Sequence, residues 1–294
     1  MKKIYWIIAI IALFFVGDRL AGYVLKEMVS ASQFRYSKIY RGAANADILL
    51  MGNSRGLGFY QPYIEEVTGK KTFNLSYNAL PMNLGRALFE DYLRHNQKPE
   101  ILVLDITMTN RIDTTLVSGF NVYTPYSEKI SAIVKDHTQN IYYGGKLSHL
   151  FIHNSEIFQR AMFYKNRSDE DWIIDRVINE NLANSVEEQR PFYVGPFDSM
   201  TVHTIFTALN ETVDIARQEG IKVKLVISPF YPPFVKKIVN EDDFIRRVQN
   251  ETGLRVHNFM DAVQDESGFG DYQHVNIHGA KLFIDSMRAA GIFD

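Results

Sequence analysis

Residues 47–59 of the chain have the sequence DILLMGNSRGLGF. An apolar run leads directly into Gly52-Asn53-Ser54-Arg55-Gly56, which matches the pattern G-x-S-x-G. A short apolar run that ends in glycine predicts a buried strand, and the pattern after it is typical of a strand-to-helix turn that exposes a nucleophilic serine. Because two glycines around a serine also occur by chance, the residues that would act on Ser54 must be sought elsewhere in the chain.

Apolar runs alternate with helical patterns along the rest of the chain. The strands predicted from these runs cover residues 47–51, 71–75, 101–106, 221–227 and 254–258. Residues 199–218 have apolar side chains at helical spacing, with Asp198 or Ser199 as the cap and Gly220 at the end. Strands that alternate with helices predict βαβ units and a mostly parallel sheet. Ligands bind such sheets beyond the carboxyl ends of the strands, and Ser54 directly follows the first strand.

The N-terminus has the pattern of a membrane anchor. Lys2-Lys3 precede residues 4–16, which carry no charge, and a second apolar run covers residues 20–25. We predict an uncleaved signal-anchor over residues 1–25 that crosses the membrane once, with the paired lysines on the cytoplasmic side and the rest of the chain outside. A cleaved signal peptide and a buried helix of a soluble protein are the alternatives.

The composition describes a globular protein and excludes some kinds of site. The chain has 294 residues, of which 46% are hydrophobic, and its formal net charge of −2 gives no reason to expect nucleic acid as a partner. It has no cysteine, which excludes disulfides and thiolate metal sites. We predict neither a metal nor another cofactor.

The predicted strands also divide the chain into regions. Residues 26–45 form a polar connector with scattered aromatic residues, and residues 46–294 form the main domain. Residues 107–198 interrupt the alternation of strands and helices; they are rich in Tyr, Phe and Asn and have helical patterns near residues 129–135 and 156–164. This insertion is interpreted either as a cap or docking surface, or as a segment with a small core of its own.

Residues 269–283, near the far end of the chain, read FGDYQHVNIHGAKLF. Asp271 and His274 lie three residues apart in a loop that leads into a helix predicted to begin near Ile277. A carboxylate in this position can fold back and accept a hydrogen bond from one imidazole nitrogen. The other nitrogen is then free to take the proton of a serine, so Ser54, His274 and Asp271 form a candidate catalytic triad.

The stretches around Ser54 and around His274 resemble two sequence blocks of the SGNH, or GDSL-like, hydrolase family. "DILLMGNS" is similar to the first block of the family and "DYQHVNIHGA" to its last, including the Asn276 and Gly279-Ala280 that often follow the histidine. The resemblance spans residues 46–290. It implies a flavodoxin-like, three-layer α/β/α fold with a mostly parallel five-stranded sheet, preceded here by the transmembrane helix.

The resemblance also implies roles for the site residues. Ser54 would be the nucleophile, His274 the base and Asp271 the residue that orients the base. The family supplies an oxyanion-hole glycine after the second strand and an asparagine after the third. The place of the glycine falls on Ala79 in "FNLSYNALP", and that of the asparagine on Asn110 in "ILVLDITMTN", with a small shift in spacing.

Simpler interpretations exist for several of these residues. Ser54 alone could cap the helix after the first strand, and Asp105, within an apolar strand, could bond to loop amides rather than approach the site. His278 lies four residues after His274, and with Asp271 these histidines are a weak pattern for zinc. The sequence lacks the glutamate of H-E-x-x-H, so we do not predict a zinc site.

Together these patterns favour a membrane-anchored, extracytoplasmic enzyme (periplasmic or cell-surface) that acts on an acyl ester through an acyl group on Ser54. Anchored relatives include proteins that work beside membrane-bound O-acyltransferases. The resemblance therefore implies an O-acyltransferase, typically an acetyltransferase, that modifies an exported glycan or cell-wall polymer with such a partner. A carbohydrate esterase or deacetylase is the alternative among enzymes, and a non-catalytic scaffold of an acyltransferase complex is the alternative from another class.

Overall fold

The structure is a computed structural model of the chain, and it describes residues 2–109, 111–168, 172–195 and 199–294. The chain divides into two compact units, which we describe separately. The helical unit consists of Met1–Ala43 and Thr114–Asp169, and the sheet unit consists of Ala44–Asp113 and Glu170–Asp294.

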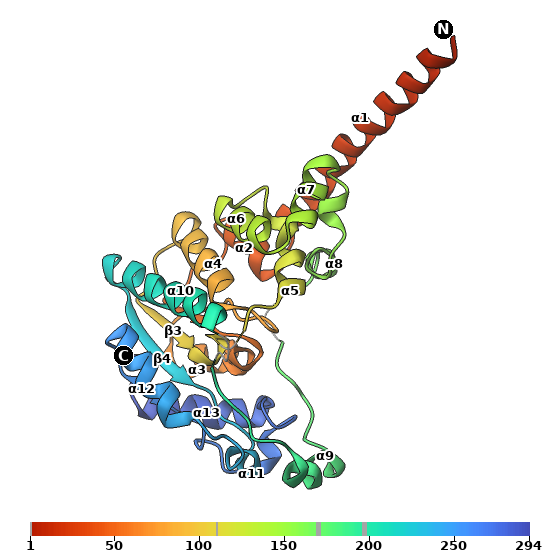
Figure 1. Cartoon of the computed structure of the whole chain (residues 1–294). Coiled ribbons are helices and arrows are strands. Elements are labelled where there is room, and N and C mark those ends of the chain that lie inside the picture. Colours follow the sequence, from red (N-terminus) through yellow and green to blue (C-terminus); the bar gives the residue numbers. More distant parts are fainter. Residues whose placement is uncertain (1, 110, 169–171, 196–198) are drawn as a thin grey trace. The chain divides into compact units, whose positions relative to one another are not determined.

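The sheet unit is built on parallel strands (Figure 1). They are β1 (Ile48–Met51), β2 (Thr72–Asn74), β3 (Ile101–Asp105), β4 (Lys222–Ile227) and β5 (Val256–Asn258). Their order across the sheet is β2-β1-β3-β4-β5, and all neighbouring pairs are parallel. This is the strand order of flavodoxin-like folds. The predicted α/β fold with a parallel five-stranded sheet is confirmed.

The burial of the strands explains why apolar runs predicted them. Leu50 of β1 pairs with Asn74 of β2 on one side and with Val103 of β3 on the other, and every residue of β1 and β3 is buried. Strands covered on both faces are apolar on both sides, which gives continuous runs instead of alternation. The order of the strands reverses between β1 and β3, and the crevice at the carboxyl ends of these two strands is where ligands bind in such sheets.

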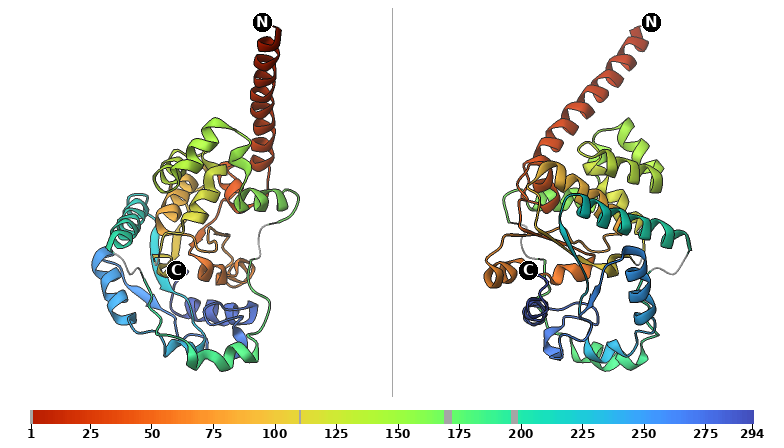
Figure 2. Two further views of the ribbon diagram at one scale, coloured as in Figure 1. Left: turned by 45° about the vertical axis from the view of Figure 1, so that its right-hand side comes forward. Right: turned by 90° about the vertical axis from the view of Figure 1, so that its left-hand side faces the viewer.

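Helices cover both faces of the sheet (Figures 1 and 2). One group contains α3 (Gln61–Thr68) and α13 (Ile277–Ala289), and the other contains α4 (Met82–His95), α10 (Ser199–Gln218) and α12 (Glu241–Thr252). Shorter helices in the loops are η1 (Ser54–Gly58), η2 (Ile106–Thr109), α9 (Glu180–Asn184), η5 (Ser185–Glu188), α11 (Pro232–Val235) and η6 (Glu266–Gly268).

Helix α10 has the bounds that the sequence predicts, residues 199–218. Its predicted cap concerns Asp198 and the side chain of Ser199, which lie outside what the structure describes. Gly220 follows the end of the helix with a φ of 71°, the left-handed conformation that glycine adopts most easily.

The helical unit has an aromatic core of its own. Its helices are α1 (Lys2–Ser30), α2 (Arg35–Tyr40), α5 (Thr114–Gly119), η3 (Phe120–Tyr123), α6 (Glu128–His137), α7 (Gln139–Leu147), η4 (Phe151–His153) and α8 (Glu156–Phe163). The buried ring of Tyr36 lies 5.3 Å from that of Phe34 and 5.0 Å from that of Phe120. The hydroxyls of Ser37 and Tyr123 share a hydrogen bond of 2.8 Å.

This core changes two of the predicted boundaries. Residues 26–45, predicted as a polar connector, include the end of α1, which continues to Ser30, and helix α2, which packs its aromatic side chains against η3. The predicted insertion, residues 107–198, is divided between the units: residues 114–168 fold with the N-terminal segment, and residues 172–195 belong to the sheet unit.

Helix α1 extends well beyond the other helices of its unit (Figure 2). Residues 3–30 have a mean hydropathy of 1.9 in their most apolar window, of which 6% is buried. The side chains there are exposed and large, such as Trp6 at 71% and Phe14 at 76%. By length and composition this helix is a candidate for a membrane span, as an anchor or as a signal sequence.

Candidate active site

Ser54 stands at the turn between β1 and the five-residue helix η1, a 3₁₀ helix. The predicted strand-to-helix turn is therefore present, although the first helix after it is short. Asn53 fixes the turn: its Oδ1 accepts a hydrogen bond of 3.0 Å from the Arg55 N–H, and its Nδ2 donates one of 3.0 Å to the carbonyl of Thr107. The turn after β1 is thereby tied to the segment after β3, and the half-buried side chain of Ser54 lies between them.

The two glycines around Ser54 allow close packing of the backbone. A Cβ atom on Gly52 would lie 2.9 Å from the Cα of Gly56, and one on Gly56 would lie 2.3 Å from the Oγ of Ser76. Real Cβ atoms do not approach other atoms so closely, so both positions require glycine. The pattern G-x-S-x-G thus has a steric reason in this chain that is independent of any chemistry at the serine.

His274 connects Ser54 to Asp271. The His274 Nε2 atom lies 2.8 Å from the Ser54 Oγ, and its Nδ1 lies 2.8 and 2.9 Å from the two carboxylate oxygens of Asp271. The carboxylate folds back over its own loop, where it also accepts hydrogen bonds from the backbone N–H groups of Gln273 (2.8 Å) and His274 (3.0 Å). The structure therefore brings together the three residues of the predicted triad.

The environment of Asp271 keeps its carboxylate charged. Partial burial acts to raise its pKa, but the hydrogen bond from His274, the charge of that ring and the two backbone N–H groups together hold the pKa below the ordinary value of 3.8. A charged carboxylate fixes a proton on Nδ1 of His274 and leaves Nε2 as the acceptor. The side chains of His274 and Asp271 remain 26% and 27% exposed, so the pair is open to a substrate.

The start of α13 holds the His274 loop in place. Asn276 caps this helix by accepting a hydrogen bond of 3.1 Å from the Gly279 N–H, and its Nδ2 donates one of 2.7 Å to the carbonyl of Ser267. Gly279 lies directly on the backbone of Gly268, where an added Cβ would be 2.0 Å from the carbonyl oxygen. These contacts give a physical reason for the asparagine and glycine that follow the histidine in the sequence.

Arg55 is a residue of the site that its sequence context did not single out. Its guanidinium is buried, with Cζ 3.3 Å from the centroid of the Phe230 ring. It donates hydrogen bonds to the carbonyls of Ser228, Pro229 (3.2 Å) and Gln273 (3.4 Å). Gln273 precedes His274, so Arg55 links the turn that carries Ser54 to the loop that carries His274.

The charge of Arg55 persists despite its burial. Burial lowers the pKa of its guanidinium to about 10, while the charges of Asp105 and Asp271 act in the opposite direction. The group is therefore cationic at neutral pH. A positive charge next to Ser54 favours a substrate whose reacting group becomes negative.

Asp105 bonds to loop groups, as the simpler interpretation of this residue expects. Its carboxylate accepts hydrogen bonds from the N–H (2.8 Å) and hydroxyl (2.6 Å) of Thr107, and from the N–H (3.3 Å) and hydroxyl of Ser228. The Asp105 carboxylate thereby joins the loop after β3, which contains Thr107, to the loop after β4, which contains Ser228.

Ala79, predicted in the place of the oxyanion-hole glycine, has the left-handed backbone conformation that glycine adopts most easily. Its φ of 58° makes it the one non-glycine residue with a positive φ in the part of the chain that the structure describes. Ala79 lines the same cavity as Ser54. The backbone N–H groups of Ala79 and Ser54 donate no hydrogen bond to a described residue. Both N–H groups are therefore available to a substrate oxygen. Asn110, the other residue predicted for this role, lies outside the described residues.

Two cavities meet at Ser54 and Arg55. One, of about 280 Å³, has mostly polar walls that include Thr107, Arg111 and Gln273. The other, of about 200 Å³, extends past His274 and Asp271. Its walls include carbon-rich side chains, namely Leu57, Trp172, Ile173, Ile174 and Val275.

The two histidines of the weak zinc pattern face different partners. His274 contacts Ser54 and Asp271, whereas the Nε2 of His278 lies 2.9 Å from the carboxylate of Asp265 on the exposed surface. Within the described residues, no group of three or more potential metal ligands is found.

No protein-family model matches the sequence, and no curated protein matches it. Two solved structures align with most of the chain. One is a protein from Streptococcus pneumonia provisionally described as a platelet activating factor, with 14% sequence identity over 94% of this chain and 98% of its own and a TM-score of 0.43. The other is a protein from Bacteroides fragilis provisionally described as an acylhydrolase, with 10% identity over 83% of this chain and 85% of its own and a TM-score of 0.39. Both likenesses are distant, and the function proposed below rests on the geometry around Ser54.

The lowered pKa of Asp271 predicts how the stability of the sheet unit depends on pH. The folded state favours the charged carboxylate, so its contribution is present above the unfolded value near 3.8 and is lost as the pH falls through the lower folded value. We expect Asp271→Asn to lower the free energy of unfolding by roughly 1–3 kcal/mol at about pH 7, with a smaller difference from wild type at about pH 3. Urea unfolding of the full chain in a nonionic detergent, followed by the fluorescence of Trp172, measures both values.

Asp261→Asn is the matched control. This carboxylate is exposed in the same part of the chain and accepts no hydrogen bond from a described residue. Its removal should change the free energy of unfolding by less than about 0.5 kcal/mol at either pH. A constant difference between Asp271→Asn and wild type across this pH range would contradict the prediction.

Proposed function

We propose that the chain is a serine-dependent acyl-ester enzyme that forms an acyl intermediate on Ser54. The observation that carries this proposal is the contact of 2.8 Å between His274 Nε2 and Ser54 Oγ, with the Asp271 carboxylate on the other ring nitrogen. A serine hydroxyl is a weak nucleophile unless a base takes its proton as it attacks. His274 is within reach of that proton, and Asp271 sets the tautomer in which Nε2 accepts it.

In the proposed reaction, the Oγ of Ser54 attacks the acyl carbonyl carbon and its proton passes to His274 Nε2. The carbonyl oxygen becomes negative, and the backbone N–H groups of Ser54 and Ala79, which donate to no described residue, are the candidates to stabilise it. His274 then gives the proton to the leaving alcohol, and an ester on Ser54 remains. A second hydroxyl, deprotonated by His274, attacks this ester and releases the serine.

We further propose that the second hydroxyl belongs to a glycan, so that the reaction is O-acyl transfer, typically of acetyl. The polar cavity beside Ser54 supports this proposal, because Arg111 and Gln273 line it and offer hydrogen bonds suited to a polyhydroxyl acceptor. The second cavity has carbon-rich walls suited to an acyl group or to the face of a sugar ring. In this proposal a membrane-bound O-acyltransferase supplies the acyl group.

We propose that α1 is an uncleaved anchor and that the sheet unit lies outside the cytoplasm. Lys2-Lys3 precede the apolar run, and cytoplasmic flanks of membrane helices carry an excess of such residues. A reporter fused after Asp294 should therefore be active on the extracytoplasmic side. Activity confined to the cytoplasm would contradict the orientation, and a mature N-terminus beyond Leu25 would contradict the uncleaved anchor.

A fluorophosphonate probe tests the acyl-ester mechanism directly. We expect it to label Ser54 in the wild type and to label neither Ser54→Ala nor His274→Ala above background, a loss of at least about 10³-fold. Asp271→Asn should be labelled more slowly than wild type but faster than His274→Ala, because the base remains while its orientation is degraded. Mass spectrometry of the labelled peptide identifies the modified residue.

Ser286→Ala is the control for this experiment. The Oγ of Ser286 donates to the carbonyl of Leu282 within α13, away from the site. This variant should be labelled at the wild-type rate, and circular dichroism should show that all variants remain folded. Undiminished labelling of Ser54→Ala would exclude the mechanism.

Transfer and hydrolysis are separated by the fate of the acyl group. The full chain in detergent is incubated with an activated acetyl ester, with and without oligosaccharide, and free acetate and acetylated sugar are measured in parallel. We expect slow release of acetate and faster formation of acetylated sugar, because a bound acceptor competes with water for the same ester. Both products should disappear in Ser54→Ala.

Different outcomes of this experiment favour the alternative functions. Rapid release of acetate that no oligosaccharide diverts would contradict transfer and favour an esterase. No product, with Ser54 never acylated even beside a native acyltransferase, would contradict both enzymes and favour a scaffold.

A further inference from the structure

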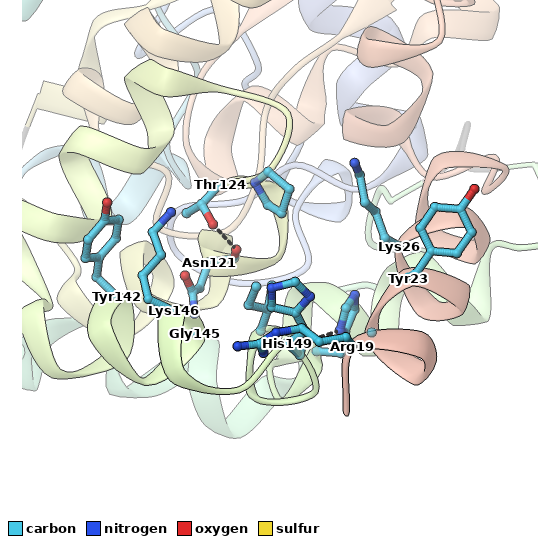
Figure 3. Close-up of a pocket in the computed structure, with 13 residues that line it drawn as sticks. Arg19, Tyr23, Lys26, Asn121, Thr124, Tyr142, Gly145, Lys146 and His149 are labelled. Carbon is cyan, nitrogen blue, oxygen red and sulfur yellow. Dashed lines mark hydrogen bonds between the residues drawn. The ribbon is translucent and has the colours of Figure 1, made fainter. Parts of the chain in front are cut away.

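The helical unit contains a cavity of about 400 Å³ between α1 and the segment from η3 to η4 (Figure 3). One wall comes from α1, where Arg19, Gly22, Tyr23 and Lys26 follow one another at helical spacing. The opposite wall includes Lys146 at the end of α7. None of these residues belongs to the sheet unit.

Two lysines give the cavity its charge. Lys26 and Lys146 both line it, and neither has a carboxylate within ion-pair distance in the described part of the chain. Each lies instead near an aromatic ring: Lys26 Nζ is 5.3 Å from the centroid of Tyr126, and Lys146 Nζ is 5.1 Å from that of Tyr142. The two lysines come from opposite walls of the cavity (Figure 3), so both can attract an anion that enters it.

The walls of the cavity are fixed to each other. The Asp18 carboxylate accepts hydrogen bonds from the N–H groups of His149 (2.8 Å) and Leu150 (3.1 Å), and it pairs with Arg19 at 2.6 Å. Gly22 packs against His149, where an added Cβ would lie 2.4 Å from the histidine Cβ. The cavity therefore keeps a constant position along α1.

If α1 spans a membrane, the cavity lies across the outer boundary of the hydrocarbon core, with Arg19 inside this boundary and Lys26 beyond it. From Ile4 to Val24 a helix rises about 30 Å at about 1.5 Å per residue, which is the thickness of the hydrocarbon core. At the level of the cavity, the outer side of α1 is still apolar: Leu20 is 63% exposed and Val24 is 55% exposed. Lys26 lies just beyond this stretch, where basic side chains reach the phosphates of lipids.

A second cavity lies nearer the N-terminus of α1, and the walls of both cavities are mostly apolar. The second cavity has a volume of about 470 Å³. Asp18 and Ser148 line part of it, and its carbon-rich walls are Leu13, Phe14, Phe15, Leu147 and Leu150. Leu147 is 81% exposed and Leu150 is 43% exposed. Both belong to the segment that also contributes Lys146 and His149 to the first cavity. Apolar side chains exposed next to a membrane helix fit the acyl chains of a lipid.

We infer that the helical unit binds one anionic phospholipid, with its phosphate in the cavity that Lys26 and Lys146 line and an acyl chain along the second cavity. This inference rests on the proposed membrane span of α1. The lysines would recognise the negatively charged phosphate of the headgroup, and a free phosphate ion offers the same group. The second cavity, at the level of the acyl chains, favours the lipid, and the bound lipid would hold the helical unit against the membrane surface.

The inference is tested with the full chain in a nonionic detergent. Delipidated protein is incubated with micelles that contain equal amounts of phosphatidylglycerol and phosphatidylcholine, and native mass spectrometry counts the lipids that remain bound. We expect one phosphatidylglycerol to be retained in preference to phosphatidylcholine. In Lys26→Gln/Lys146→Gln this preference should fall by about tenfold or more, since each basic group near the headgroup contributes to anion binding.

Lys135→Gln/Lys165→Gln is the matched control, because it removes the same charge from exposed positions of the same unit that do not line the cavity. It should retain the wild-type preference. Circular dichroism checks the folding of both double variants, and Lys146→Gln alone, an exposed position, should still lower the preference if the double variant unfolds. Equal preference in the two double variants, or equal retention of both lipids by the wild type, would overturn the inference.

Two further measurements distinguish a lipid from a free ion, and the lipid site from the membrane span. Inorganic phosphate at millimolar concentration should leave the bound lipid in place; displacement by phosphate alone would assign the cavity to the free ion and overturn the lipid. Quenching of Trp6, near the start of α1, by brominated phosphatidylcholine in vesicles reports insertion of the helix independently of lipid preference. Absence of quenching would contradict the membrane span itself, whereas quenching without anionic preference would contradict only the lipid site.

Discussion

The hydrogen bond between Ser54 and His274 joins two segments that lie 220 residues apart in the sequence. A parallel sheet makes this possible, because all strands end at one edge and their following loops meet there. The loop after β4 connects the two segments: Arg55 donates to its carbonyls, and the N–H of Tyr231 in the same loop donates to the carbonyl of Tyr272 at 3.0 Å. The position of His274 relative to Ser54 therefore depends on three loops, and a change in any of them moves the His274 ring.

Close backbone contacts hold both ends of this hydrogen bond. Gly52 and Gly56 approach each other at the serine turn, and Gly268 and Gly279 approach each other below the histidine loop. Each pair excludes side chains and leaves its backbone little room to shift. The glycines around Ser54 are thus a requirement of packing, and they do not by themselves identify a nucleophile. The contact with His274 distinguishes Ser54 from a serine that only occupies a tight turn.

The sequence predicted those features that depend on local pattern. Buried parallel strands appear as apolar runs, and the spacing of Asp271 and His274 allows one side chain to fold back on the other. The role of Arg55 could not be predicted, because its partners are backbone carbonyls whose positions no residue type reveals. The helical unit could not be predicted for a similar reason. Tyr36 packs against Phe120, which lies more than eighty positions further along the sequence. Residues that resemble a connector in the sequence therefore belong to a core.

Transfer and hydrolysis would use the same acyl intermediate on Ser54. The outcome depends on what occupies the polar cavity when the ester is attacked. Water is always present, but a hydroxyl held in a reactive position can act with an effective concentration of about 10⁵ M or more, which exceeds that of liquid water. An acceptor bound through Arg111 and Gln273 would therefore compete successfully with water without any change in Ser54, His274 or Asp271. In the proposed mechanism, the residues that select transfer are those of the cavity wall, and they act by positioning the acceptor.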